Sequence, residues 1–481
     1  MKVFIRVLSL VLALIMVAST FIACGDDTKN PAGTNEGNGE LRFEGEEYRI
    51  LGRDFQDDMF REFEIDRDEM PEDVVGIAVW NRNEAIKAKY GLEVVGTLEK
   101  DPGAVAQVAL EAGEDQFDLI LRSPAWLQPM AMQGYFLNIA KLENIDLTAD
   151  CWNDYANTQL TMGGKLYYTT SKFLLHDKHR LGVTFYNRDL AEDLKVGYLE
   201  EKVLNGTWVI EDLVNIAKTC SSDKDGIDGM SMNDTWGVTI ESAAGGFSRL
   251  SFGIGFRISE NGSDGYPQLI GATDQMVTSL DKVFELTADK NTCYIFTLRD
   301  VSDRPGDAVS GGDRAIFVRG DAVTLIDCMS TIDNTGEMNF AYGVLPMPKL
   351  SADQESYYSL PDTNNGTLMA VPATVTDAAK AGFGLQKISE ESVTTSYTAY
   401  IDTKCKLQDA YDEDMAKCLD LIFDGVVYDV AYVADIGGMR QLMSDLVVGG
   451  MNIYASQFKK KEKKAAAEMK DIKSTYAKHM T

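Results

Sequence analysis

The chain has 481 residues with 45% apolar content, which is enough for roughly two to three domains or one large two-lobed body. Its formal net charge of -29 at pH 7 argues against nucleic acids and anionic membrane surfaces as partners, because both would repel it. The acidity otherwise indicates only a well-solvated surface.

Residues 1–23 predict an export signal. Lys2 and Arg6 precede an apolar run that starts at Val7, and a polar stretch begins directly after Cys24. The pattern resembles a bacterial lipoprotein signal, in which the cysteine thiol receives a diacylglyceryl group, although Phe21 stands where such signals usually have Leu. A single transmembrane anchor is the alternative, since the apolar run approaches the ~20 residues that cross a bilayer. We expect a lipid on Cys24 that holds the chain at a membrane, outside the cytoplasm.

Residues 24–45 predict a flexible tether. They consist mainly of Gly, Asn, Asp, Glu, Thr and Pro, which bury too little apolar surface to offset the loss of chain entropy on ordering. A flexible segment of about 20 residues spans roughly 25 Å, which lets a folded body turn above a membrane.

Beyond the tether, short β-rich runs alternate with longer helical patterns. The predicted strands are Tyr48–Leu51, Leu92–Val95, Phe117–Leu121, Gly182–Tyr186 and Trp236–Ile240, and the predicted helices among them are Val74–Tyr90, Gly103–Ala112 and Ile210–Thr219. This alternation indicates βαβ units and parallel sheets, in two α/β lobes. After about Thr376 helices dominate, over Met415–Phe423, Met439–Val448 and Ala455–Tyr476.

Six cysteines follow Cys24 without the spacing of a metal site: Cys151, Cys220, Cys293, Cys328, Cys405 and Cys418. An exported protein could pair them as disulfides, yet a core of this size does not need them. Free buried thiols and disulfides both remain open.

Motifs over most of the mature chain resemble the family 1, sugar-binding type of extracellular solute-binding proteins of ABC importers. The segments that carry the resemblance are Val79–Asn83, Tyr90–Val94, Phe117–Ile120, Gln133–Ile139, Gly164–Tyr168, Phe185–Leu190, Thr207–Trp208, Ala217–Lys218, Asp225–Gly226, Trp236–Gly237, Ala315–Asp321 and Tyr342–Pro348. The chain departs from the family at Val209, where a hydroxyl residue usually caps the next helix; Asp212 can still complement that helix terminus.

The resemblance implies a type II periplasmic-binding-protein-like fold, with two α/β lobes, each a sheet flanked by helices, and a ligand cleft between them. It also implies three crossings between lobes. The expected first lobe is 46–169 plus 306–362, and the expected second lobe is 170–305 plus 363–481. A hinge of this kind closes the lobes over a ligand and excludes water.

Ligands of open α/β sheets lie beyond the carboxyl ends of the strands, so the loops there contain the candidate contacts. A sugar presents hydroxyl groups at its edge and C–H groups on its faces, which suit polar side chains and a flat aromatic ring. The candidates are Arg53, Arg122, Ser123, Trp126, Lys172, Asp177, Phe247, Asp321, Asp362 and Asn364. For the aromatic residues the alternative is core packing, for the charged residues a solvated surface, and for Asp362 and Asn364 turn chemistry.

Other motifs support weaker interpretations. His176 and His179 lack a carboxylate or cysteine at ligand spacing, so we expect no metal site and no cofactor. The run Asp223–Gly229 departs from the EF-hand pattern at Ile227 and Asp228, which favours a surface turn over a calcium loop. The lysines of 459–464 indicate a solvated helix face or a contact with the transporter.

The resemblance therefore implies a monomeric binding protein that captures a carbohydrate and delivers it to membrane permease subunits. We expect no enzymatic activity, because the sequence contains no nucleophile elbow, zincin motif or Cys/His dyad. The alternatives are a surface or sensory carbohydrate-binding lipoprotein without transport, and a carboxylate-based enzyme acting on glycans.

Overall fold

The computed structural model describes residues 41–54, 64–66, 71–227, 229–299 and 312–478. The predicted signal, Cys24 and most of the tether lie outside these residues. Residues 44–481 make up one compact unit. None of the helices within the described ranges has the length and apolar character to cross a membrane.

The first of two main sheets has four strands in the order β11-β3-β1-β2. Its strands are β1 (Glu46–Arg53), β2 (Leu92–Glu99), β3 (Leu119–Arg122) and β11 (Leu368–Ala370). β1 pairs in parallel with β2 and β3, whereas β11 is antiparallel to β3. The helices around this sheet are α2 (Val74–Tyr90), α3 (Pro102–Ala112), α4 (Pro124–Met132), α5 (Asp154–Leu160) and α13 (Ala378–Ser392).

The second main sheet has five strands in the order β10-β4-β9-β5-β8. Its strands are β4 (Gly182–Asn187), β5 (Trp236–Ile240), β8 (Cys293–Ile295), β9 (Ala322–Cys328) and β10 (Tyr342–Leu345). β5 is parallel to β8 and β9, while β4 is antiparallel to β9 and β10. Helices around it are α7 (Arg188–Asp193), α8 (Leu199–Leu204), α9 (Ile210–Cys220), α10 (Ala243–Gly253), α11 (Asp274–Thr287), α12 (Gly312–Val318) and α14 (Glu413–Asp424).

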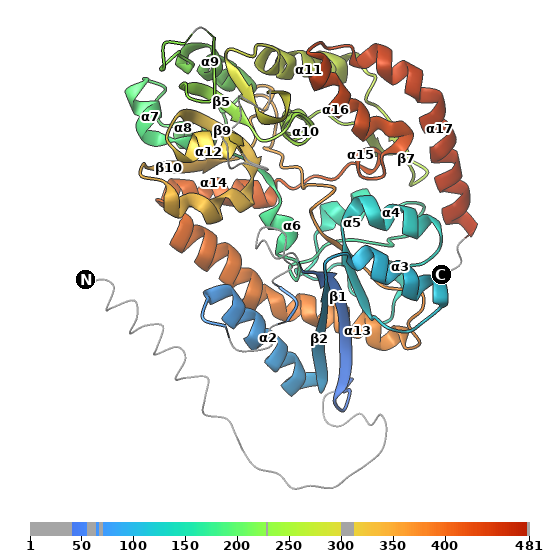
Figure 1. Cartoon of the computed structure of the whole chain (residues 1–481). Coiled ribbons are helices and arrows are strands. Elements are labelled where there is room, and N and C mark those ends of the chain that lie inside the picture. Colours follow the sequence, from blue (N-terminus) through green and yellow to red (C-terminus); the bar gives the residue numbers. More distant parts are fainter. Residues whose placement is uncertain (1–40, 55–63, 67–70, 228, 300–311, 479–481) are drawn as a thin grey trace, which may run out of the picture. The chain divides into compact units, whose positions relative to one another are not determined.

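The remaining elements connect and cover the two sheets. They are α6 (His176–His179), a hairpin of β6 (Ser259–Asn261) and β7 (Pro267–Leu269), the π-helical η6 (Val393–Tyr397) and η7 (Ala399–Asp409), α15 (Val430–Val433), α16 (Met439–Gly449) and α17 (Tyr454–Lys478). Short 3₁₀ helices are η2 (Ile139–Lys141), η3 (Phe296–Leu298), η5 (Met329–Glu337) and η8 (Ile436–Gly438). The long α17, red in Figure 1, packs on α16 and also contacts α4.

The chain passes between the two sheets three times. The first passage lies between residues 171 and 181 and includes α6, the second is 346–367 between β10 and β11, and the third runs through η6 and η7 from α13 to α14. The strand pairing therefore differs from the expected lobe segments. β9 and β10, within 306–362, belong to the five-stranded sheet, and β11, after residue 363, belongs to the four-stranded sheet. The difference arises because β9 and β10 both pair antiparallel with β4. The chain therefore leaves the five-stranded sheet only after β10.

Local sequence explains why these elements form. Every residue of β5 is buried, as expected of a central strand that is covered on both faces. α2 begins after Asp73, whose carboxylate accepts the Gly76 N–H, and ends at Gly91, which has a left-handed φ of 67°. At the start of α9 the Asp212 carboxylate accepts the Val209 N–H at 3.0 Å, as the sequence predicted in the absence of a hydroxyl cap.

Candidate functional site

A cavity of about 220 Å³ lies at the carboxyl end of β5, where the second passage between the sheets reaches the start of α10. Its walls come from the turn after β5, the loop 360–365, Tyr432 of α15 and one side of α16. The lining residues are Glu241, Ser242, Ala244, Gly245, Arg249, Leu360, Pro361, Asp362, Thr363, Asn364, Asn365, Tyr432, Arg440, Gln441 and Ser444. Polar and charged side chains predominate.

The turn after β5 forms because its residues suit a strand followed at once by a helix. Ser242 has an extended backbone, and its Oγ accepts the Gly245 N–H at 3.0 Å, which caps α10. Gly246 packs so close to the end of β5 that a Cβ there would overlap the Ile240 side chain. The first turn of α10 therefore sits tightly against the strand and places Ala244 and Gly245 at the cavity wall.

Asp362 organises the loop on the opposite side of the cavity. Its Oδ1 accepts the N–H groups of Asn364 at 2.9 Å and Asn365 at 3.1 Å, and its carbonyl oxygen accepts the Gly366 N–H at 2.7 Å. This is an Asx-type turn, so the alternative of turn chemistry holds for Asp362. The turn leaves the Asn364 side chain exposed at the cavity.

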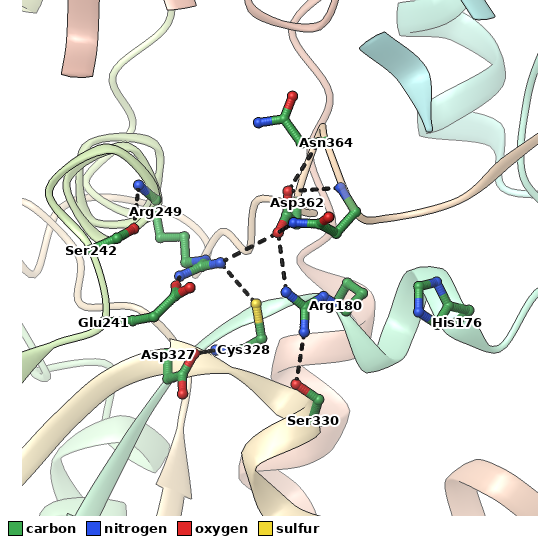
Figure 2. Close-up of polar contacts among 12 residues, drawn as sticks. His176, Arg180, Glu241, Ser242, Arg249, Asp327, Cys328, Ser330, Asp362 and Asn364 are labelled. Atoms are coloured by element: carbon green, nitrogen blue, oxygen red, sulfur yellow. Dashed lines mark hydrogen bonds and ion pairs between the residues drawn. The ribbon is translucent and has the colours of Figure 1, made fainter. Parts of the chain in front are cut away.

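Two buried arginines hold the other oxygen of Asp362 (Figure 2). Arg180 Nη2 lies 3.1 Å and Arg249 Nη2 lies 3.9 Å from Asp362 Oδ2, and each arginine is only 3% exposed. Arg249 Nη1 also pairs with Glu241, and Arg249 Nη2 donates to Cys328 Sγ at 2.8 Å. The Arg180 Nη1 donates to Ser330 Oγ at 3.0 Å. The cluster thus ties the end of β5, the end of β9 and the passage 346–367 together.

The electrostatic balance of this cluster keeps Asp362 ionised. Burial alone would raise the pKa of its carboxyl, but the charges of Arg180 and Arg249 hold that pKa well below its ordinary value. Burial likewise acts against the charge of Arg249, and the neighbouring carboxylates of Glu241 and Asp362 oppose that effect, so the pKa of Arg249 is raised. Two arginines and two carboxylates leave the cluster close to neutral.

Two predicted site residues, Asp362 and Asn364, come together at the cavity. A third supports the same turn from the four-stranded sheet, since Arg53, at the end of β1, donates from Nη1 to the Asn365 carbonyl at 3.2 Å. The start of α4 also reaches this loop, because the Ala125 N–H donates to the Thr363 carbonyl at 3.3 Å. Residues at the carboxyl ends of β1, β3 and β5 therefore converge on the 362–365 turn, as strand polarity predicts.

Three other predicted residues lie around the start of α4 and are not part of the cavity wall. Arg122 Nη2 lies 3.6 Å from an Asp101 carboxylate oxygen, and Ser123 occupies the N-cap position of α4 without a side-chain cap bond. Trp126 is half-buried, with its ring centroid 6.3 Å from that of Phe136. This ring contact favours the alternative of core packing for Trp126, although part of the indole stays accessible.

Two predicted residues of the first passage, Lys172 and Asp177, have protein partners. Lys172 Nζ lies 2.6 Å from Asp150 Oδ2, and it stacks over the Tyr397 ring. The buried Asp177 carboxylate accepts from Lys178 Nζ at 2.7 Å and from Thr170 Oγ1 at 2.6 Å. Neither residue lines the cavity.

The structure places Phe247 and Asp321 away from the cavity. Phe247 is 1% exposed, and its ring centroid lies 5.1 Å from that of Phe284, so α10 directs it into the core. Asp321 precedes β9, and its carbonyl accepts the N–H of Trp236 at the amino end of β5, the opposite end from Glu241. Its carboxylate pairs with Lys224 and Arg319 at the surface.

The histidines and the acidic loop make hydrogen bonds within the part of the chain that the structure describes. His176 Nδ1 lies 3.1 Å from Thr367 Oγ1, and His179 Nε2 lies 2.7 Å from Asp333 Oδ2. Carboxylate oxygens of Asp223, Asp225 and Asp234 lie within 4.8 Å of one another. The Asp234 carboxylate accepts backbone N–H groups of Lys224, Asp225 and Ser231, which is the hydrogen-bonding pattern of a surface turn.

The six cysteines after Cys24 are all free and buried in the structure. Their pairing as disulfides, which the sequence left open, is therefore not found.

Several residues at the cavity were not among the sequence candidates. Arg249 lines the cavity, and Arg180 pairs with Asp362 without being part of the cavity wall; no spacing in the sequence indicates that these two buried arginines share a carboxylate. Glu241 directly follows the carboxyl end of β5, where strand polarity places candidate contacts, whereas Tyr432, Arg440 and Ser444 reach the cavity only through the packing of α15 and α16.

The chain resembles several solved structures in fold. A cyclo/maltodextrin-binding protein complexed with maltotetraose has a TM-score of 0.54 at 13% identity, with 91% of this chain and 99% of that chain covered. UgpB from Mycobacterium tuberculosis in complex with glycerophosphocholine has a TM-score of 0.53 at 14% identity, covering 82% and 95%. An ABC substrate-binding protein from Listeria monocytogenes in complex with cycloalternan has a TM-score of 0.51 at 15% identity, covering 90% and 99%.

No family model and no curated protein matches the sequence. The likeness to solved structures extends over nearly all of the described chain, and at these identities it concerns the fold. The chain has the two-lobed α/β fold of the periplasmic-binding-protein type, as found in ABC substrate-binding proteins.

Proposed function

We propose that the protein is an extracytoplasmic, lipid-anchored substrate-binding protein of an ABC importer, and that it captures a carbohydrate by closing its lobes. The observation that carries the proposal is the polar cavity at the carboxyl end of β5, beside a passage between the two sheets. Ligands of open α/β sheets bind at such a position. A site beside the passages is also the place where a hinge motion changes the enclosed volume most directly.

The chemistry of the cavity suits a polyhydroxylated ligand. Asn364, Gln441 and Ser444 offer amide and hydroxyl groups that both donate and accept hydrogen bonds. Tyr432 adds an aromatic surface. The volume of about 220 Å³ is below the ~300–1,000 Å³ of pockets for drug-sized ligands, which favours one sugar ring in this conformation.

The anchoring part of the proposal rests on sequence. Cys24 and the tether of residues 24–45 would keep a monomeric binding protein within reach of permease subunits, at a high effective concentration. We propose lobes that follow the strand pairing, with the passages at 171–181, 346–367 and 393–409 as the hinge.

The state of Asp362 argues against a glycan-active enzyme at this cavity. A glycosidase needs one carboxyl group with a raised pKa as its general acid. The pKa of Asp362 is instead held low by two arginines, and the Glu241 carboxylate is paired with Arg249. We therefore propose binding without catalysis. A sensory or surface-binding role with the same ligand would differ only in lacking a permease partner.

A thermal-shift screen of the purified protein against mono-, di- and oligosaccharides tests the proposal. A carbohydrate at 100 times its Kd stabilises the folded state by about 2.7 kcal/mol, which is a clear shift of the melting temperature. The Asn364→Ala variant should lose most of that shift, whereas Asn233→Ala, in the surface turn before β5, should retain it. The absence of a shift with every carbohydrate would refute the carbohydrate assignment. Co-purification with permease subunits separates a transport role from a sensory one.

A further inference from the structure

Arg440 places a positive charge at the cavity wall. It lines the cavity from the first turn of α16, and among the described residues its guanidinium forms no ion pair. Its Nη1 donates to the Val433 carbonyl at 3.4 Å, a long and neutral hydrogen bond. The nearby Asp435 carboxylate accepts the backbone N–H groups of Arg440 and Gln441 and caps α16 rather than pairing with the guanidinium.

The other charges at the cavity are already compensated. Arg249 pairs with Glu241 and Asp362, and Asp362 also pairs with Arg180. The ion-paired cluster therefore contains two cations and two anions, and Arg440 adds one positive charge to the wall. The charge of Arg440 also reaches the phenol of Tyr432: burial raises the pKa of that phenol, and Arg440 opposes the increase.

The first turn of α10, a helix that packs on α16, adds to the same positive potential. Ala244 and Gly245 belong to the first turn of α10, and the N-terminal end of an 11-residue helix carries a partial positive charge. Arginine presents a planar fork that fits the two oxygens of a carboxylate or phosphate. A neutral sugar would leave that fork without an anionic partner when closure removes water.

We propose that the ligand is an acidic carbohydrate, and that Arg440 binds its carboxylate or phosphate group. The inference rests on the proposed carbohydrate-binding function and narrows it to a substrate class. Asn364, Gln441 and Ser444 would then bind the hydroxyl groups of the same ring, and Asp362 would hold the turn that presents Asn364.

Calorimetric titration with matched sugars tests the assignment. The probes are pairs of a hexose and the hexuronate with the same ring stereochemistry, the corresponding hexose 6-phosphate, and inorganic phosphate alone. We expect one acidic sugar to bind at least tenfold more tightly than its neutral partner, which corresponds to about 1.4 kcal/mol. Whichever of the hexuronate and the hexose 6-phosphate binds more tightly shows whether the anionic group is a carboxylate or a phosphate. Inorganic phosphate should bind more weakly than either, because it lacks the hydroxyl groups of the ring.

Two variants, each of which removes one positive charge, distinguish a direct contact between Arg440 and the anionic group of the ligand from a general electrostatic attraction by the protein. Arg440→Gln should weaken the acidic sugar at least tenfold and the neutral sugar less than twofold, and Arg440→Lys should restore part of the loss. Lys463→Gln, on the exposed face of α17 and outside the cavity wall, should change neither affinity. Equal melting temperatures of the unliganded variants will show that both are folded.

Three results would overturn the inference. These are equal affinity for the acidic and neutral partners, equal weakening of both by Arg440→Gln, and a Lys463→Gln effect as large as that of Arg440→Gln. Each of these three results would leave carbohydrate binding intact, so each would contradict only the role assigned to Arg440. The failure of all probes and all neutral saccharides to bind would instead refute the proposed function on which the inference rests.

Discussion

Asp362→Asn is the substitution that tests the buried cluster most sharply. The amide keeps the size of the side chain and an Oδ1 that can still accept the N–H groups of Asn364 and Asn365. It removes the negative charge that Arg180 approaches at 3.1 Å and Arg249 at 3.9 Å. Its new NH₂ group would also face these donors and the Asn365 amide, which currently donates to Oδ2 at 3.0 Å.

The expected loss of stability is about 3–5 kcal/mol, the usual cost of removing one partner from a buried ion pair. Glu241 continues to pair with Arg249, so the uncompensated charge falls mainly on Arg180, which is 3% exposed. Asp321→Asn is the matched control. Asp321 also pairs with two cations, Lys224 and Arg319, but these are 58% and 40% exposed, and such surface pairs contribute about 0.2–1 kcal/mol.

Urea unfolding followed by tryptophan fluorescence measures both variants at pH 7. The difference in stability between the wild type and Asp362→Asn should also depend on pH. The folded-state pKa of Asp362 lies well below its unfolded value of about 4, so its contribution to stability is present above pH 4 and is lost as the pH falls toward the folded-state pKa. The difference between wild type and Asp362→Asn should therefore be constant from pH 7 to about 5 and shrink below about 4. A loss under about 1 kcal/mol at pH 7, or one equal to that of Asp321→Asn, would refute this view of the cluster.

Three further predictions concern other parts of the molecule. Ser242→Ala should lower the free energy of unfolding by about 1 kcal/mol, because it removes the cap of α10, and hydrogen exchange should increase in the first turn of that helix. A thiol reagent should label none of the six buried cysteines in the native state and all six after unfolding without a reductant; fewer labelled thiols would indicate disulfides. Trp126→Ala should leave carbohydrate affinity unchanged in calorimetry, because Trp126 packs against Phe136 and is not part of the cavity wall; a clear loss of affinity would show that its accessible indole contacts the ligand.

Much of the fold could be predicted from local sequence, because hydrophobic periodicity and capping residues act over short distances. The pattern of Val74–Tyr90 gives α2 its observed bounds, and the buried run Trp236–Ile240 coincides with β5. The lobe assignment of 306–362 was less predictable. The residues of β9 and β10 indicate strands, yet nothing in them shows that β4 lies between the two and pairs with both.

The site was predictable only where strand polarity applies. Asp362 and Asn364 lie in a turn that the carboxyl ends of β1 and β5 reach, and both are at the cavity. Phe247 follows β5 as well, but the helical period of α10 turns its ring into the core. Arg440 comes from α16, nearly 200 residues further along the chain than β5, and only the packing of α16 on α10 brings it to the site. The proximity of residues this far apart in the chain depends on the tertiary structure, and the spacing of residues in the sequence does not indicate it.

We propose that a carbohydrate binds in the cavity between the 362–365 turn, α10 and α16. The most direct test of this proposal is a calorimetric titration of the wild type and of Asn364→Ala with the saccharide that produces the largest thermal shift. We expect one bound ligand per chain and at least tenfold weaker binding by the variant, since Asn364 lies at the cavity with its side chain exposed. A variant that binds this saccharide with wild-type affinity would contradict the proposal.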